Sequence, residues 1–315
     1  MSKNLIPHPA SLKTIGEFGL IAKIRKMTKT DSSVLLGIGD DTAVIRWRGK
    51  EKILFTTDML IEDQHFRLTE ASGFEIGWKA MAVNISDIAA MGGLPTHAVA
   101  AVGLPRELAI DFVEQIYLGI QTAAKRFDVN IVGGDTNASK KLVISVALLG
   151  TTVKHAPLTR SGAKSGDVVF VTGKLGGSYA SKKHLNFTPR ILESQFLINN
   201  FNIHSMMDIS DGLMSDIHRI ARASRVGVVL SKEAIPISQS ALNFEEACTG
   251  GEDFELLFTL PPKEAARLTF DKKPKALVSF CPVGKIVPKK YGMNFMKADG
   301  GTEPLLEKGY NHFHN

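Results

Sequence analysis

Short acidic motifs recur along the whole chain, and they constrain its fold and its function more than any other feature. The first spans residues 36–45, where Gly37 and Gly39 precede adjacent Asp40 and Asp41, and an apolar run follows. Glycine allows a tight turn or a close approach of the backbone to a ligand. Neighbouring side chains of an extended segment point to opposite sides, so one of the two carboxylates is expected to face a given site. Taken alone, the motif is also compatible with an ordinary solvated turn.

The spacing of apolar residues predicts an α/β fold in two domains. The clearest helix spans 74–91 and ends at Gly92 and Gly93. The other expected helices are 16–27, 110–127, 212–224 and 263–270. The expected strands are 43–47, 52–57, 96–104, 129–132, 142–149, 167–172, 206–209, 227–231, 254–260 and 276–287. The polar stretch 151–165 contains Pro157 and Gly162. It is interpreted as the passage between an N-terminal domain, 1–152, and a C-terminal domain, 153–315.

Acidic residues recur at the junctions between these strand-like runs and the turns or helices beside them. They are Asp40, Asp58, Asp87, Asp135, Asp208, Asp211, Glu252 and Asp253. Ligands of α/β proteins gather where strands end, so several of these carboxylates could converge on one site. Two carboxylates about 5 Å apart repel by roughly 3 kcal/mol at an effective dielectric near 20. A converged cluster therefore predicts bound metal, and oxygen-only ligands favour Mg²⁺ or Mn²⁺ over zinc.

Several candidates also have plain structural interpretations. Asp87 shares a helix face with Asn84 and either enters a site or meets water. Asp211 either binds a ligand or caps the helix that follows it. His65 is either a ligand contact or a structural histidine, and Arg160 either neutralises phosphate or is a solvated arginine of the linker.

Composition and charge argue against several classes of protein. The chain has 315 residues, 44% of them hydrophobic, as in globular proteins with a substantial core. The net charge is +6, but no basic stripe alternates with aromatic residues, which argues against a nucleic-acid partner. We expect no membrane partner, because no apolar run has spanning length. Cys248 and Cys281 form no disulfide framework, and the N-terminus lacks a signal-peptide pattern, so a cytoplasmic location is expected.

Familiar nucleotide-binding motifs are missing from the sequence. No Gly-x4-Gly-Lys-Ser/Thr loop is present, and residues 37–42 lack the last glycine of a dinucleotide fingerprint. A protein-kinase catalytic loop is absent too. The surplus of positive charge nevertheless suits a small polyanionic ligand.

The motifs taken together resemble those of the thiamine-monophosphate kinases, in the PurM-like ATP-binding superfamily. The resemblance runs from about residue 16 to the end. It is carried, in order, by GIGDDTA (37–43), TDML (57–60) with His65 and Phe66, AVNISDIAAMG (82–92), GGDT (133–136), LTRSGA (158–163), DISDGL (208–213), GGEDFEL (250–256) and GYNHF (309–313). It implies a two-domain, mixed α+β PurM-like architecture with N-terminal domains paired in a homodimer and nucleotide bound near that interface. It also implies direct, Mg²⁺-assisted transfer of the γ-phosphate of ATP to thiamine monophosphate, without a catalytic nucleophile.

The same resemblance implies roles for individual residues. Several Mg²⁺ ions would be bound by Asp40, Thr56, Thr57, Asp58, Asp87, Asp135, Asp208 and Asp211. ATP would be contacted by Tyr117, Gly134, Arg160 and Ser210. The thiamine substrate would be contacted by His65, Glu252 and Tyr310. Of the two adjacent acids in the first motif, Asp40 is expected to bind metal and Asp41 to orient the turn.

Two segments of the second domain, 173–189 and 236–250, are shorter than this family leads us to expect. Other enzymes of the superfamily are alternatives. A selenophosphate synthetase would carry a reactive cysteine near the N-terminus, whereas the first cysteine here is Cys248. An aminoimidazole-ribotide synthetase would not account for His65-Phe66 together with the closing 309–313 motif. A non-catalytic relative that binds metal or nucleotide is a third possibility.

Overall fold

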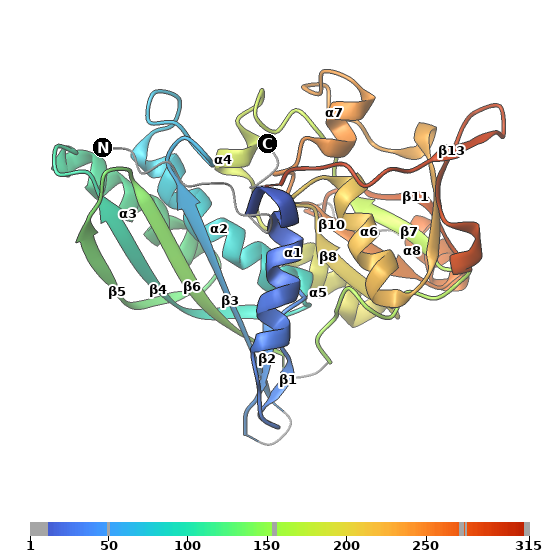
Figure 1. Ribbon diagram of the computed structural model, residues 1–315, viewed down its shortest axis with the longest axis horizontal. Helices are drawn as coiled ribbons and strands as arrows, with labels where there is room; N and C mark the ends of the chain where they lie inside the picture. Colours follow the sequence, from blue (N-terminus) through green and yellow to red (C-terminus); the bar gives the residue numbers. More distant parts are fainter. Residues whose placement is uncertain (1–11, 49–50, 153–155, 271–273, 275, 312–315) are drawn as a thin grey trace.

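The computed structural model describes residues 12–48, 51–152, 156–270, 274 and 276–311, and the chain forms two sheets that lie side by side (Figure 1). The strand order is β1-β2-β3-β6-β4-β5 in the first sheet and β13-β12-β9-β11-β7-β10-β8 in the second. Helices α2 and α3 cover one face of the first sheet (Figure 1). The predicted mixed α/β fold is therefore confirmed.

The first sheet and its helices occupy the N-terminal half. Their bounds are α1 Leu12–Met27, β1 Val34–Leu36, β2 Ala43–Arg46, β3 Lys52–Ile61, α2 Gly73–Ala90, β4 Leu94–Leu104, α3 Ile110–Arg126, β5 Asn130–Ala138 and β6 Val143–Thr152. The second sheet and its helices follow. Their bounds are β7 Val168–Thr172, α4 Lys183–Asn186, α5 Ile191–Asn200, β8 Ser205–Asp208, α6 Leu213–Ser224, β9 Gly227–Ser231, η1 Lys232–Ala234, α7 Phe244–Thr249, β10 Leu256–Leu260, α8 Pro262–Phe270, β11 Phe280–Val287, η2 Lys289–Tyr291, β12 Met293–Met296 and β13 Thr302–Pro304.

Helix α2 lies at the centre of the molecule and contacts both domains. It begins at a capping box, in which Ser72 and Glu75 each bind the other's backbone N–H, and nearly all of its residues are buried. It packs on β3 and β6, on α3, and on α4, α5 and β8 of the second domain. A Cβ at Gly77 would lie 1.9 Å from the carbonyl oxygen of Ile116, so only glycine permits this close approach to α3. One helix thus carries side chains to the junction of the two domains.

Two strands are longer than the sequence predicts, and the difference changes where their acids lie. β3 continues past residue 57 to Ile61, and β5 continues past residue 132 to Ala138. Asp58 and Asp135 therefore lie inside strands, so the prediction that both follow strand ends is wrong. The exposure of β3 alternates around Thr56 and Thr57, and all of β5 is exposed at a sheet edge. Polar residues can therefore lie in both strands without the free-energy cost of burying a polar side chain.

The remaining differences concern short elements and the domain boundary. β1, α4, α5, α7, β12 and β13 have no counterpart among the predicted elements, because most of them are too short to show a period. The first sheet ends at Thr152 and the second begins at Val168. The proposed boundary adjoins residues 153–155, which lie outside the described residues, so it stays a prediction. No helix in the described part of the chain has both the length and the apolar character needed to cross a membrane.

Residues 176–190 are tied to the motif at 250–256 by buried polar and ionic contacts. Arg190 donates through Nε and Nη2 to the two carboxylate oxygens of Glu255, both at 2.7 Å. Lys183 donates to the same carboxylate at 2.9 Å, and the Gly176 N–H donates to Asp253 at 3.0 Å. Paired in this way, the buried acids order the loop that closes one side of the domain junction.

Candidate active site

A cleft of about 1950 Å³ lies where the two domains meet. The first domain lines it with α1, the loop 37–42, β3 and α2, and the second domain with β8, α6, and residues of 250–254 and 307–311. Arg160, from the segment between the two sheets, also lines it. A space of this size exceeds that of a site for one drug-sized ligand, so it can hold a nucleotide and a second small molecule.

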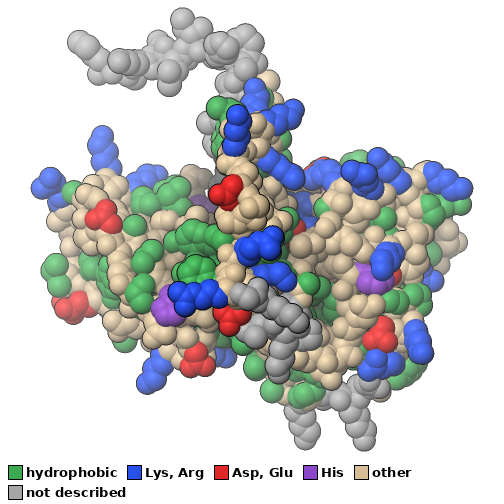
Figure 2. All heavy atoms as spheres, turned by 90° about the horizontal axis from the view of Figure 1, so that it is seen from below, with side chains coloured by type: hydrophobic (Ala, Val, Ile, Leu, Met, Phe, Trp, Pro, Cys, Tyr) green, Lys and Arg blue, Asp and Glu red, His purple; other side chains and the backbone are tan. Residues whose placement is uncertain are grey.

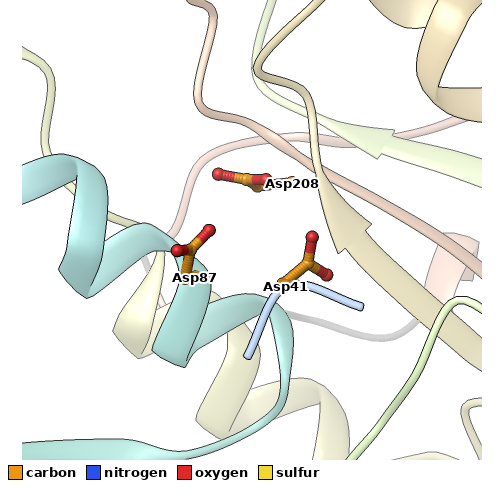
Figure 3. A group of neighbouring side chains, drawn as sticks. All are labelled: Asp41, Asp87 and Asp208. Carbon is orange, nitrogen blue, oxygen red and sulfur yellow. The ribbon is translucent and has the colours of Figure 1, made fainter. Parts of the chain in front are cut away.

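Three carboxylates from distant parts of the sequence converge in this cleft. Asp41 comes from the loop before β2, Asp87 from α2 and Asp208 from the end of β8, and their side chains point toward one another (Figure 3). One oxygen of each lies within 4.8 Å of the others. Among the described residues, no group hydrogen-bonds to the buried Oδ2 of Asp41. An all-oxygen cluster with an unused buried acceptor fits a hard divalent cation such as Mg²⁺.

Hydrogen bonds from neighbouring side chains orient each acid. Thr56 Oγ1 donates to Asp87 at 2.5 Å, and Ser86 Oγ donates to Asp208 at 2.6 Å. Arg160 donates to Asp41 through Nη2 at 2.5 Å and through Nε at 3.2 Å. Arg160 is therefore not a solvated linker residue: it places a positive charge against the cluster, where phosphate oxygens would lie.

Burial makes two of these carboxylates, Asp87 and Asp208, unusually hard to ionise in the absence of a cation. It raises the pKa of Asp87 and of Asp208 well above the ordinary value, and neighbouring carboxylates add to the effect. Burial also raises the pKa of Asp58, which is hydrogen-bonded to Asp87, to about 6. A divalent cation would reverse this balance by stabilising the ionised forms.

We predict that the stability of the metal-free protein falls as the pH rises from about 4 to 7. In this window the folded protein holds protons on Asp58, and on Asp216, whose pKa burial raises to about 7, while the unfolded chain has released them. Added Mg²⁺ should raise the melting temperature more at pH 7.5 than at pH 5, because it binds the ionised acids. Thermal unfolding at both pH values, with and without Mg²⁺, checks this, and an equal Mg²⁺ effect at both would contradict it.

The two adjacent acids of the first motif take different positions from those expected. Both oxygens of Asp40 accept from the backbone N–H of Arg160 at 3.2 Å, and burial raises its pKa to about 7. Asp41, instead, belongs to the three-carboxylate cluster. The geometry thus favours Asp41 as the metal ligand and Asp40 as the residue that orients the turn, the reverse of the sequence-based assignment. A direct metal contact for Asp40, which also lines the cleft, stays a prediction.

Asp211 is already paired with a cation. It binds the Arg219 guanidinium, which also donates to the fully buried Asp216 at 2.8 Å. Helix α6 has Gly212 as its N-cap, with no side-chain cap bond, so the helix-capping alternative for Asp211 is wrong. Asp211 and Ser210 both line the cleft, beside the cluster's Asp208.

The residues expected to contact a second substrate lie together on the side of the cleft next to α2. His65, Glu252 and Tyr310 all line it. His65 Nδ1 accepts from the backbone N–H of Ile61 at 2.9 Å, which sets the orientation of its ring. Tyr179 lines the same side and is hydrogen-bonded to Glu252, and burial raises its pKa.

Sequence reasoning gave Asp41 a different role and missed Tyr179, Arg219 and Lys79. Lys79 is wholly buried in α2 and forms an ion pair with Glu252 at 2.6 Å. Its signal was available, because a charged residue in an otherwise apolar helix needs a partner, and the same reasoning identified Asp87. Arg219 carries no comparable signal, since it lies among other polar residues.

Family models and similar proteins agree on one family. The descriptions "AIR synthase related protein, N-terminal domain" and "C-terminal domain" match residues 39–152 and 164–293. The thiamine-monophosphate kinase of Rhodopirellula baltica is 40% identical over 79% of this chain and 84% of its own length. That of Bacillus subtilis is 34% identical over 94% and 99%.

The chain belongs to the thiamine-monophosphate kinase family. A structure of AaThiL complexed with AMPPCP and TMP superposes with a TM-score of 0.83 at 33% identity, covering 97% of this chain and all of that one. A hydrogenase maturation protein, HypE, in its complex with HypF, reaches a TM-score of 0.73 at 19% identity, which shows a shared fold alone.

Three residues that the resemblance to thiamine-monophosphate kinases assigns to this site lie apart from the cleft. Gly134 and Asp135 lie on the exposed edge strand β5, and Tyr117 lies on α3. None of the three is among the residues that line the cleft. Asp135 instead accepts a hydrogen bond from the Asn137 side chain at 2.7 Å. Their roles in binding ATP or metal stay predictions.

Proposed function

We propose that this protein transfers the γ-phosphate of ATP to the phosphate of thiamine monophosphate, forming thiamine diphosphate and ADP. The observation that carries the proposal is that one cleft is lined both by the Asp41–Asp87–Asp208 cluster and by His65, Glu252 and Tyr310. The family and the related structure that binds AMPPCP and TMP support the same reaction.

The residues suit direct phosphoryl transfer. This chemistry needs positioning and neutralisation of oxygen charge more than a covalent nucleophile. Asp41, Asp87 and Asp208 would hold Mg²⁺, with Asp58 and Thr56 beside them; bound Mg²⁺ supplies charge neutralisation between donor and acceptor phosphates. Arg160, which is hydrogen-bonded to Asp41, would neutralise phosphate oxygens beside the cluster, and Glu252 would accept a hydrogen bond from an N–H of the thiamine group. Because the acceptor phosphate is already an anion, no strong general base is required.

The decisive experiment is an assay of thiamine diphosphate formation from ATP and thiamine monophosphate with Mg²⁺. We expect product only when all three are present. If no product forms at high enzyme concentration although nucleotide still binds, the protein is a non-catalytic relative and the proposal fails.

We further propose that two copies pair through the first sheet, by the face that α2 and α3 leave uncovered. Hydrophobic side chains gather near the middle of the left-hand lobe, which is the first domain (Figure 2). Phe55, Met59, Val99 and Val132 are exposed on this sheet. Monomers seldom leave such a surface uncovered. Pairing here would carry the off-cleft residues Gly134 and Asp135 toward the partner.

We predict that Val132→Lys separates the two copies. A lysine on β5 places a charge in the proposed apolar contact, where burying it without a partner is costly. Light scattering should show twice the mass of one chain for the wild type and one chain for the variant. Leu242→Lys, at an exposed leucine of the second domain, is the matched control and should stay paired. A monomeric wild type at assay concentration would contradict the proposal.

A cytoplasmic location also stays a proposal.

A further inference from the structure

Lys79 is a wholly buried lysine whose side chain joins the two domains behind the cleft wall. Its Nζ donates to Glu252 Oε2 at 2.6 Å and to the backbone oxygen of His65 at 2.8 Å. Helix α2 of the first domain carries Lys79, and Glu252 belongs to the second domain. A buried ammonium group needs such partners, because its transfer from water into a protein interior is costly.

The two partners of Lys79 both line the cleft, although Lys79 does not. His65 belongs to the turn after β3, and Glu252 lies between α7 and β10. Lys79 thus connects two segments that are distant in sequence and that form one side of the cleft. A change at Lys79 can therefore reach the ligand site through both partners, although Lys79 itself does not line it.

The backbone at Glu252 is held in a conformation that side chains rarely adopt. Its φ is 54°, and Phe254 has a φ of 49°. The N–H of Glu252 donates to the Ser210 oxygen at 2.6 Å, and the N–H of Phe254 donates to the Ile209 oxygen at 2.8 Å. Left-handed backbone at non-glycine residues persists where the surroundings enforce it, and it clusters at ligand sites.

We propose that Lys79 is a positioning residue for the acceptor substrate, acting through Glu252. Its ammonium group holds the Glu252 carboxylate in place at the cleft, at a set separation from His65. A carboxylate has about four acceptor sites, so contacts with Lys79 and Tyr179 leave capacity for a substrate N–H. This inference rests on the proposed function, because thiamine monophosphate supplies that donor.

The test compares binding of the two substrates in Lys79→Met. Calorimetry measures the Kd of thiamine monophosphate with Mg²⁺ and AMPPCP present, and separately the Kd of AMPPCP with Mg²⁺. We expect the acceptor Kd to rise by about 10- to 100-fold, as misplacement of a contact group does. The AMPPCP Kd should change by less than about twofold, because Lys79 bonds to Glu252 and His65 and lies about 12 Å along α2 from the cluster's Asp87.

A double-mutant cycle tests whether Lys79 acts through Glu252. In a Glu252→Gln background, Lys79→Met should change the acceptor Kd by no more than about twofold. Full additivity of the two changes would overturn the proposal. So would a folded Lys79→Met that binds the acceptor like the wild type, or one that loses AMPPCP to the same degree.

Controls separate positioning from general loss of structure. Lys232→Met removes another ion-paired lysine, whose partner is Glu303 outside the cleft, and should leave the acceptor Kd unchanged. If Lys79→Met does not unfold cooperatively, Lys79→Gln, which keeps a donor for the His65 oxygen, is judged by the same criteria. Failure of both to fold would assign Lys79 to structure alone. A wild type that binds AMPPCP but no thiamine monophosphate would overturn the proposed function itself, and with it the role of Lys79.

Discussion

Replacing Asp87 by asparagine is expected to abolish turnover while stabilising the metal-free protein at neutral pH. Asp87 is the member of the three-carboxylate cluster that α2 carries, and its loss removes a charged ligand from the Mg²⁺ site. We expect thiamine diphosphate formation to fall by at least about a thousandfold, as when a main source of transition-state charge stabilisation is lost.

Asp87→Asn is expected to raise stability although it lowers activity, and the reason is electrostatic. Burial raises the pKa of Asp87 well above the ordinary value, so at pH 7 the folded protein bears a free-energy cost, of burying the ionised group or of protonating it, that the unfolded chain does not bear. Asparagine removes that cost and should add about 1 kcal/mol or more to the free energy of unfolding at pH 7. The gain should vanish near pH 4, where the unfolded chain also binds the proton.

Denaturant unfolding at pH 4 and 7 and the product assay check this pair of effects. Asp111→Asn, at an exposed aspartate in the first turn of α3, is the matched control and should alter neither. Wild-type turnover in Asp87→Asn would remove Asp87 from the metal site. A loss of stability at pH 7 would contradict the electrostatic account of the cluster.

Replacing Arg160 by methionine is expected to damage both stability and nucleotide binding. Arg160 donates two hydrogen bonds to Asp41, whose other oxygen is buried without a partner among the described residues. Removing the guanidinium leaves a buried carboxylate uncompensated. The cost should be about 2–3 kcal/mol, below the full effect for a buried pair because the arginine side chain is partly exposed.

Magnesium should rescue the stability of Arg160→Met but not its nucleotide binding. A cation at the cluster compensates Asp41, so saturating Mg²⁺ should recover much of the lost melting temperature. The KM for ATP should still rise by about tenfold or more, since a charge-assisted contact to phosphate is gone. Unchanged KM for ATP, measured in the coupled kinase assay, would contradict a phosphate contact for Arg160.

The sequence predicted the long, strongly periodic elements and the motifs better than it predicted single side chains. Residues 74–91 indicated α2 because apolar residues recur there at helical spacing over a long stretch, a pattern that the sequence alone displays. The strand that carries Asp58 was ended too early, since a half-exposed strand tolerates polar residues that a local reading takes for a turn.

The choice between Asp40 and Asp41 could not be made from local pattern. Alternation establishes that the two carboxylates diverge but not which one turns inward. The direction depends on Arg160, about 120 residues later, which contacts Asp40 through its backbone and Asp41 through its side chain. Likewise, Lys79 and Glu252 meet only because the second domain packs on α2, a contact with no local signature.

Lys79 and Asp87 lie on the same uninterrupted helix, α2. Their separation along the axis is about 12 Å, from a rise of 1.5 Å for each of the eight steps from Lys79 to Asp87. Phosphoryl transfer works only when the entering and leaving groups meet at a narrow range of distances. If Lys79 positions the acceptor substrate and Asp87 the donor substrate, α2 fixes the distance between the two. Small rocking of one domain against the other would then leave the separation between Lys79 and Asp87 unchanged. Inserting a single residue between Lys79 and Asp87 would rotate one of the two side chains by about 100° about the helix axis relative to the other, so they would no longer both keep their present contacts.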